Sequence, residues 1–293
     1  MAVLAVDIGG TKMAAAIIDG TGELSGLARR VLTPRTTKPS EVWDALAGLV
    51  GAVEADWTGG PLEACGVGCG GPMSPGGAAV SPLNIPAWRG FALRDRLADL
   101  TGLRCVVDND AKALALAEGW IGAAGGARDF IAMVVSTGVG GGIVLNGRLL
   151  EGAAGNAGHI GHVVVEPGGE PCACGSRGCL EALASGPSIE RISGRPAAEA
   201  SDVMRARVGR LVGRAVADVV NLLDLRLAVV AGSVALGFGA LFFEAAQAEL
   251  DATARLEFAV GARIVPAALG ADAPLVGAAA LAFRALGTLP SLA

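Results

Sequence analysis

One pattern of residues occurs twice in this 293-residue chain, first around residue 7 and again around residue 137. In the first copy an apolar run ends at Asp7, a glycine turn follows, and a second apolar run extends from Met13 to Ile18. The second copy has an apolar run at Phe130–Val135, the turn S-T-G-V-G-G-G, and another run at Ile143–Leu145. An apolar run on each side of a glycine turn is typical of two paired strands. The recurrence therefore predicts two related α/β domains that face one another.

The chain is long enough for two domains, because domains commonly contain about 100–200 residues. We expect a small N-terminal α/β domain at residues 1–112 and a larger C-terminal α/β domain at residues 113–274. A final helix, within about residues 275–293, is expected to pack back on the N-terminal domain. Hydrophobic periodicity predicts further elements. These are helices at 39–54, 111–117, 202–223 and 274–286, and strands at 24–32, 64–68, 104–107 and 227–230.

Apolar residues make up 52% of the chain, which raises the question of a membrane protein. Two long uncharged stretches, 130–147 and 227–243, are both interrupted by glycines and polar residues. Neither provides the roughly 20 continuous apolar residues of a spanning helix, so we interpret both as buried strands followed by glycine turns. The net charge of -5 argues against a nucleic-acid groove. The N-terminus lacks the features of a signal peptide and the cysteines are expected to be free, which favours the cytoplasm.

Both histidines and three of the six cysteines lie in one short stretch, residues 155–181. Four of these side chains provide the number of donors that a closed tetrahedral zinc site needs. The four are His162, Cys172, Cys174 and Cys179. Gly175 and Gly178 allow the backbone to turn around an ion, because glycine accepts positive φ angles. The alternatives are buried cysteines that fill space and a disulfide, but three cysteines and a histidine this close favour zinc. We interpret Cys65, Cys69 and Cys105 as buried filler.

The two glycine turns are candidate phosphate sites, because backbone N–H groups on such turns can approach phosphate oxygens closely. Asp7 precedes the first turn and is placed to hold Mg²⁺ through water. Neither turn has the Walker A sequence, and a glycine turn taken alone is most often an ordinary hairpin.

Asp110 is the candidate catalytic base. It lies where a strand ends and a helix begins, the position at which open α/β sheets present ligands. The helix dipole favours its ionised form, which a proton acceptor requires. The alternative is a helix-capping role for Asp110 or Asn109.

The four arginines of the 202–223 helix are interpreted as its solvent-exposed face; they are Arg205, Arg207, Arg210 and Arg214.

Five motifs occur in a fixed order: D-I-G-G-T-K, V-V-D-N-D-A-K-A-L, S-T-G-V-G-G-G, G-H-I-G-H and C-A-C-G-S-R-G-C-L-E. In these motifs the chain resembles the ROK family (repressors, open reading frames, kinases) over nearly its whole length. Repressors of that family carry a helix-turn-helix ahead of the first glycine motif. Asp7 leaves no room for one here, so the resemblance favours the kinase branch.

The resemblance implies an actin-like (ribonuclease H-like, hexokinase-type) two-domain fold with sugar and ATP in a central cleft. By position, Asp110 looks like the base that takes the proton from the primary hydroxyl of a hexose. Residues matching the sugar-binding positions are Gly71, Asn84, Asn109, His159, His162 and Glu181. Residues matching the phosphate and nucleotide positions are Asp7, Gly9, Gly10, Thr11, Lys12, Thr137, Gly138, Gly232 and Ser233.

The same resemblance implies a structural zinc that orients His162, Mg²⁺ bound with ATP, and a homodimer or homotetramer. His159 stands where the family usually has a glutamate, and Lys112 where many members have asparagine; Gly70-Gly71-Pro72 is a shifted form of the usual loop. A neutral imidazole both accepts and donates a hydrogen bond, whereas a carboxylate only accepts. N-acetylmannosamine kinases of the family also have A-G-H-I-G-H, whereas its glucokinases more often have the glutamate. The resemblance therefore implies glucose or a 2-acetamido hexose as the substrate. The substitution could equally leave specificity unchanged.

Two other functions stay open at this point. The chain could be a catalytically silent sugar-binding regulatory protein, although the intact Asp7, glycine turns and Asp110 speak against that function. It could also be a glucokinase that uses polyphosphate in place of ATP.

Overall fold

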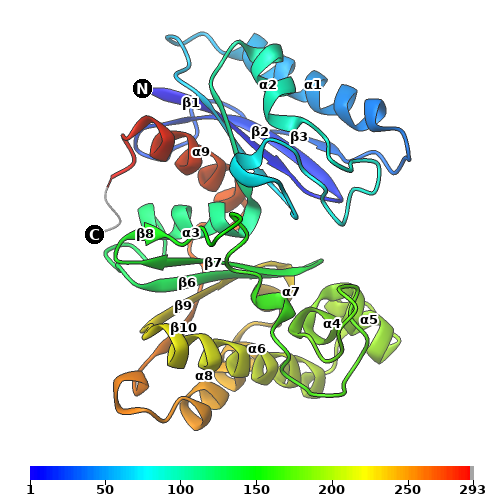
Figure 1. The fold of residues 1–293 in the computed structure, drawn as a ribbon, viewed down its shortest axis with the longest axis vertical. Helices are drawn as coiled ribbons and strands as arrows, with labels where there is room; N and C mark the ends of the chain where they lie inside the picture. Colours follow the sequence, from blue (N-terminus) through cyan, green and yellow to red (C-terminus); the bar gives the residue numbers. More distant parts are fainter. Residues whose placement is uncertain (291–293) are drawn as a thin grey trace. The chain divides into compact units, whose positions relative to one another are not determined.

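The computed structural model describes residues 1–290, which form two compact units (Figure 1). Unit 1 comprises Met1–Ile121, Glu151–Ala157 and the described residues from Ala271 onward. Unit 2 comprises Gly122–Leu150 and Gly158–Gly270. The domain boundary expected at residue 112 falls within a helix that belongs wholly to unit 1, and the two units contain similar lengths of chain.

The sheet of unit 1 has five strands among the described residues, in the order β3-β2-β1-β4-β5. Its strands are β1 (Ala2–Ile8), β2 (Lys12–Asp19), β3 (Arg29–Leu32), β4 (Cys65–Cys69) and β5 (Cys105–Asn109). The first three pair antiparallel, and β1, β4 and β5 pair parallel. The strand predicted at 24–32 is shorter than expected, because Gly26 turns the chain with a φ of 117° ahead of Arg29.

Helices cover both faces of this sheet. On one face lie α1 (Pro39–Asp56) and α2 (Leu93–Thr101), and on the other lies α9 (Ala273–Leu286), as Figure 1 shows. The apolar stripe predicted for α1 is confirmed, since Val42, Leu46, Leu49, Val50 and Val53 are all buried. α9 approaches the sheet very closely: a Cβ built on Gly66 of β4 would lie 1.8 Å from the carbonyl oxygen of Ala278. The three cysteines interpreted as filler, Cys65, Cys69 and Cys105, are buried as predicted.

Unit 2 repeats this sheet, which confirms the predicted internal similarity. Its order, β8-β7-β6-β9-β10, corresponds strand for strand to β3-β2-β1-β4-β5 of unit 1. The antiparallel and parallel pairs are also the same. The strands are β6 (Phe130–Val135), β7 (Val139–Leu145), β8 (Arg148–Leu149), β9 (Leu227–Ala231) and β10 (Arg263–Pro266).

The core of unit 2 lies between its sheet and the paired helices α6 (Asp202–Leu223) and α8 (Ala240–Thr253). Two glycines of α6 let the helices approach closely: a Cβ on Gly209 or Gly213 would lie 2.4 Å or 2.2 Å from a carbonyl oxygen of α8. The stretch 227–243 was expected to be a strand and a glycine turn, and this is wrong beyond Ala231, because two helices follow. The other helices of the chain are α3 (Asp110–Trp120), α4 (Leu180–Ala184), α5 (Gly186–Ser193) and α7 (Ser233–Phe238). Short 3-10 helices are η1 (Pro75–Gly77), η2 (Ile160–His162), η3 (Ala197–Glu199), η4 (Glu257–Ala259) and η5 (Gly270–Asp272).

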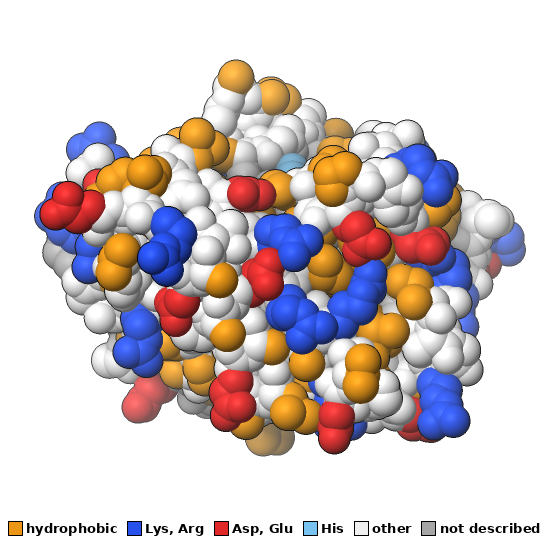
Figure 2. Space-filling model, turned by 90° about the horizontal axis from the view of Figure 1, so that it is seen from below, with side chains coloured by type: hydrophobic (Ala, Val, Ile, Leu, Met, Phe, Trp, Pro, Cys, Tyr) orange, Lys and Arg blue, Asp and Glu red, His pale blue; other side chains and the backbone are white. Residues whose placement is uncertain are grey.

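Among the described residues, no helix has both the length and the apolarity needed to cross a membrane. On the face drawn in Figure 2, basic and acidic side chains are interspersed with apolar ones, so the surface there carries no large field of one sign.

Candidate active site

The first glycine turn joins β1 to β2 in unit 1 and is held by backbone hydrogen bonds. Gly9 N–H donates to the carbonyl of Lys12 at 3.0 Å, and the hydroxyl of Thr33 donates to the carbonyl of Gly9 at 2.7 Å. A Cβ built on Gly10 would lie 2.5 Å from the Cβ of Asn84, so only glycine fits against that segment. The turn therefore brings the predicted phosphate residues next to a predicted sugar residue. Thr11 and Lys12 of the same turn are exposed.

The segment that carries Asn84 is fixed by buried neighbours. Ile85 and Trp88 are buried, and Trp88 Nε1 donates to the carbonyl of Pro39 at 3.2 Å. Gly71 accepts a hydrogen bond from the backbone of Leu83 at 3.3 Å. The Asn84 side chain itself is exposed, so it remains available for a ligand.

Asp7 of β1 and Asp110, which follows β5, both border Gly68 of β4, the strand between β1 and β5. A Cβ built on Gly68 would lie 3.7 Å from Asp7 Oδ1 and 3.8 Å from the Cα of Asp110. Burial and the charge of Asp110 raise the pKa of Asp7 to about 7, and Lys12 opposes this shift. Two carboxylates that repel one another in this way favour a bound cation or a shared proton.

Asp110 begins helix α3 directly after strand β5, as the sequence predicts. Asn109 is the N-cap residue, and its Oδ1 accepts a hydrogen bond from Ala111 N–H at 3.0 Å. Asp110 Oδ1 accepts from the same N–H at 2.9 Å, while the residue as a whole is exposed. The first turn of α3 thus orients both predicted residues.

The second glycine turn, in unit 2, lies against Glu181 of α4. Glu181 Oε2 accepts a hydrogen bond from Val139 N–H at 2.9 Å, and a Cβ built on Gly138 would lie 3.0 Å from that oxygen. Thr137 is exposed at the tip of the turn. A predicted sugar residue and a predicted phosphate turn are therefore neighbours here too.

The predicted adenosine turn contacts the same region of unit 2. The hydroxyls of Ser136 and Ser233 lie 2.9 Å apart. Gly232 has a φ of 102°, and a Cβ there would lie 2.3 Å from the carbonyl oxygen of Val135. Glycine is therefore required at this position, and Gly232 and Ser233 adjoin the phosphate turn.

The four predicted metal ligands converge in unit 2. Their ligand atoms all lie within 4.8 Å of one another. Cys174 Sγ lies 3.7 Å from Cys179 Sγ, and Cys172 Sγ lies 3.6 Å from His162 Nδ1. A tetrahedral zinc ion with bonds of about 2.0–2.3 Å separates its ligand atoms by roughly 3.5–3.8 Å, so the residues fit zinc.

The backbone of this loop also fits a metal site. Gly175 and Gly178 have φ angles of 92° and 74°, as predicted from their place in the loop. Burial and the neighbouring thiols raise the pKa of the Cys179 thiol to about 12. A bound cation would offset the cost of ionising this thiol, because the thiolate is the form that ligates zinc. Cys179 also precedes the first residue of α4, the helix that carries Glu181.

The two histidines are close together, with ring centroids 6.0 Å apart. His162 directs Nδ1 toward Cys172, which leaves Nε2 on the other side of the ring. His159 is exposed and precedes the short helix η2 that ends at His162.

The α6 arginines are at least partly exposed, as interpreted, but at least two of them also bind groups on other segments. Arg207 pairs with Glu166 at 2.7 Å, and Arg214 pairs with Glu249 at 2.7 Å while also donating to the carbonyl of Val165 at 3.0 Å. These contacts attach the start of the cysteine loop to α6. Their partners lie far along the chain, so no sequence spacing indicates them.

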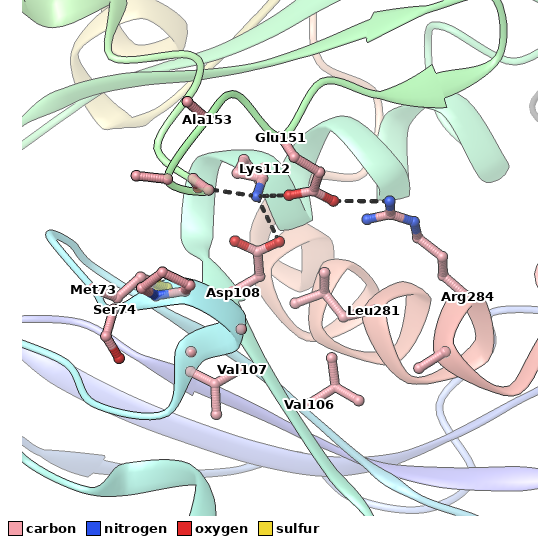
Figure 3. A pocket seen from close by; sticks show the side chains of 16 residues that line it. Met73, Ser74, Val106, Val107, Asp108, Lys112, Glu151, Ala153, Leu281 and Arg284 are labelled. Atoms are coloured by element: carbon pink, nitrogen blue, oxygen red, sulfur yellow. Dashed lines mark hydrogen bonds and ion pairs between the residues drawn. The ribbon is translucent and has the colours of Figure 1, made fainter.

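Unit 1 also contains a pocket of about 470 Å³ that was not predicted from the sequence. It lies beside the edge strand β5 and is lined by Asp108, Lys112, Glu151 and Arg284 among others (Figure 3). Asp108 and Lys112 are four residues apart, but Asp108 lies in β5 and Lys112 in α3, so the helix spacing rule for ion pairs does not indicate this contact.

A model of the ROK family matches residues 3–285. N-acetylmannosamine kinases of Escherichia fergusonii and Shigella flexneri are 38% and 37% identical over 256 residues, covering 82% of this chain and 86% of each relative. Among solved structures, the ROK hexokinase of Thermus thermophilus has a TM-score of 0.82 at 36% identity, with 98% of this chain and 99% of that chain covered. The ROK family glucokinase of Streptomyces griseus, in complex with glucose and AMPPNP, has a TM-score of 0.83 at 31% identity, covering 96% and 99%.

These likenesses identify the fold as the actin-like, hexokinase-type α/β fold, which confirms the predicted class. The chain belongs to the ROK family.

Proposed function

We propose that this chain is an ATP-dependent kinase that phosphorylates the C6 hydroxyl of a hexose, either glucose or a 2-acetamido hexose such as N-acetylmannosamine. Similarity over most of the chain to N-acetylmannosamine kinases, a hexokinase and a glucokinase supports the proposal. The observation that carries it is the pair Asp7 and Asp110 beside Gly68, next to the first glycine turn.

In this proposal Asp110 is the general base. Its carboxylate accepts the proton of the C6 hydroxyl while the hydroxyl oxygen bonds to the γ-phosphorus and the bond to the ADP oxygen breaks. Its exposure at the first turn of α3 supports this role, because substrate can reach the group and the helix N-terminus favours the ionised form.

The glycine turns would bind the phosphates through backbone N–H groups. Gly9, Gly10, Thr11 and Lys12 of unit 1 and Thr137 and Gly138 of unit 2 are assigned to them, with Gly232 and Ser233 assigned to adenosine. Mg²⁺, when bound with ATP, neutralises phosphate charge, and Asp7 would hold it through water. A divalent cation would also offset the burial and the repulsion from Asp110 that together raise the pKa of Asp7.

The sugar hydroxyls are assigned to Gly71, Asn84 and Asn109 of unit 1 and to His159, His162 and Glu181 of unit 2. The bound Val139 N–H fixes the carboxylate of Glu181. A zinc ion on Nδ1 of His162 would fix the tautomer and direction of that ring, which leaves Nε2 for a sugar oxygen. Zinc is therefore assigned a structural role and activates no water.

The choice of hexose turns on His159. An imidazole can donate to the carbonyl of an acetamido group at C2, which a carboxylate cannot do. We therefore assign N-acetylmannosamine ahead of glucose, in agreement with the names of the relatives quoted above.

The test is a panel of glucose, mannose, N-acetylglucosamine and N-acetylmannosamine with Mg·ATP, monitored by ADP release. The proposal predicts turnover with at least one of these sugars and the largest kcat/KM for a 2-acetamido hexose. Binding of a sugar by calorimetry without turnover of any would instead identify a silent sugar-binding protein.

A second donor is favoured by one observation. The polyphosphate/ATP-glucomannokinase of Arthrobacter sp. strain KM has a TM-score of 0.68 at 27% identity, covering 97% of this chain. Repeating the panel with polyphosphate in place of ATP separates the two donors.

A further inference from the structure

Lys112 is a buried lysine whose ammonium group is held by three protein partners. Its side chain is 1% exposed. The Nζ atom lies 2.8 Å from Asp108 Oδ2, forms an ion pair with Glu151, and donates to the carbonyl of Gly155 at 3.3 Å (Figure 3). An ammonium group is strongly hydrated in water, so its burial requires partners of this kind.

Glu151 extends the network to the last helix. Its Oε1 lies 2.8 Å from Arg284 Nη2 of α9, while Oε2 faces Lys112. Burial acts to raise the pKa of Glu151, but hydrogen bonds from the two cations outweigh it and lower that pKa. Asp108 is more deeply buried, and the effect of burial outweighs that of its partner Lys112, so the pKa of Asp108 is raised. Glu151 is therefore the carboxylate that joins α3 to α9.

The segment 151–157 is joined to α3 and α9 by these contacts. None of its residues is buried. It closes on itself through the Ala157 N–H, which donates to the carbonyl of Glu151 at 3.0 Å. On one side Ala153 and Ala154 line the pocket of about 470 Å³.

The position of this segment in the chain places the ion-pair network close to two assigned site residues. The chain leaves unit 2 after Leu150 and re-enters it at Gly158, so the segment is a short excursion into unit 1. Lys112 is two residues after Asp110, and the segment ends two residues before His159. The ammonium group therefore connects the helix of the assigned base to the segment that leads to an assigned sugar residue.

We propose that Lys112 and Glu151 are positioning residues that set the affinity for the sugar by fixing segment 151–157 to helix α3. This inference rests on the proposed function. Neither side chain is assigned a contact with substrate, and both act through the segment they hold. All charged groups of the network are paired with one another, so the pocket itself is assigned no ligand.

The test uses Glu151→Gln in the full chain, because Glu151 is 45% exposed and its replacement leaves Lys112 paired with Asp108. We expect the KM for the sugar to rise about 5- to 20-fold, with kcat and the KM for ATP within about two-fold of the wild type. Asp56→Asn, which breaks the exposed ion pair with Arg29 in the same unit, is the matched control and leaves all three constants unchanged.

A second measurement reports on the segment without using activity. Hydrogen–deuterium exchange of peptides covering 151–157 is expected to be faster in Glu151→Gln than in the wild type and in Asp56→Asn. Lys112→Met combined with Asp108→Asn removes the cation without leaving a buried charge, and is expected to reproduce both effects.

A purely structural network would lower the melting temperature and the active fraction while leaving the sugar KM unchanged, and that result would overturn the proposal. Unchanged exchange in both variants would overturn it as well. Failure of the proposed function can be distinguished from failure of this inference. In that case the wild type itself would phosphorylate no hexose of the panel.

Discussion

Asp7 and Asp110 border the same glycine, Gly68, and the charge of Asp110 adds to burial in raising the pKa of Asp7 to about 7. Near neutral pH the protein without Mg²⁺ therefore carries Asp7 in both protonation states. Binding of a divalent cation favours the ionised form. Proton release should thus accompany the binding of Mg·ATP, and should fade as the pH rises above about 7.

The raised pKa of Asp7 predicts a pH-dependent stability in the absence of Mg²⁺. Folding favours the protonated form, so its stabilising effect is complete below the ordinary value of 3.8 and is lost as the pH rises through about 7. Across this window the wild type should lose up to about 4 kcal/mol of unfolding free energy that Asp7→Asn does not lose. Urea unfolding between pH 5 and 8, at roughly constant salt, measures the part of this loss that falls above pH 5, about 3 kcal/mol. Parallel curves for the two proteins would contradict the shift.

Asp110→Asn tests the assigned base. The amide keeps the size of the side chain and can still accept from Ala111 N–H, but it cannot take a proton. We expect kcat to fall by about 10²-fold or more with the sugar KM within a few-fold. Asp44→Asn, on the exposed side of α1, is the control. Turnover near the wild-type value would remove Asp110 from the proton transfer.

Cys174→Ser tests the metal loop. Loss of one thiolate should lower the zinc content of protein purified without added metal, and should weaken sugar binding because His162 loses its fixed direction. Cys65→Ala removes a buried cysteine from unit 1 and should keep the zinc content unchanged. Zinc analysis and calorimetry with the sugar give the two readings. Full sugar affinity in a zinc-free Cys174→Ser protein would mean that the loop orients His162 without the ion.

His159→Glu tests the assignment of the sugar. A carboxylate cannot donate to an acetamido carbonyl, so kcat/KM for N-acetylmannosamine relative to glucose should fall by about ten-fold or more. The ratio is measured with both sugars on the same preparation. An unchanged ratio would identify His159 as a tolerated replacement with no part in specificity.

Gly10→Ala tests the contact between the first turn and the Asn84 segment. The added methyl would lie 2.5 Å from the Cβ of Asn84, so one of the two must move. We expect a loss of about 1–3 kcal/mol of stability and a clear drop in kcat/KM. Gly60→Ala, where a Cβ meets nothing within 4 Å, is the control for the loss of a glycine. Equal behaviour of both variants would show that the contact is dispensable.

Local patterns in the sequence were sufficient for much of the fold. The amphipathic stretch 202–223 matches α6 residue for residue, and the turn at Asn146 and Gly147 has the positive φ angles that its N-G sequence predicts. The helices α7 and α8 were missed because Gly232 and Gly239 look like hairpin glycines. In the structure they flank α7, with φ angles of 102° and 62°.

The candidate site likewise has contacts that the sequence indicates and contacts that it does not. The metal ligands are close in sequence, so their spacing was informative. Lys112 pairs with Glu151, and Arg214 contacts Val165 and Glu249, so these partners lie far away in the chain. Such long-range pairs depend on how the elements pack, and no periodicity within one element encodes them.

Helix α4 connects three features of unit 2 within three residues. Cys179 closes the cysteine loop, Leu180 begins the helix, and Glu181 accepts the Val139 N–H next to the second glycine turn. Depletion of the metal should therefore weaken the retention of both co-substrates at once. A chelator is therefore expected to lower the sugar affinity and the nucleotide affinity in parallel, as the zinc content falls.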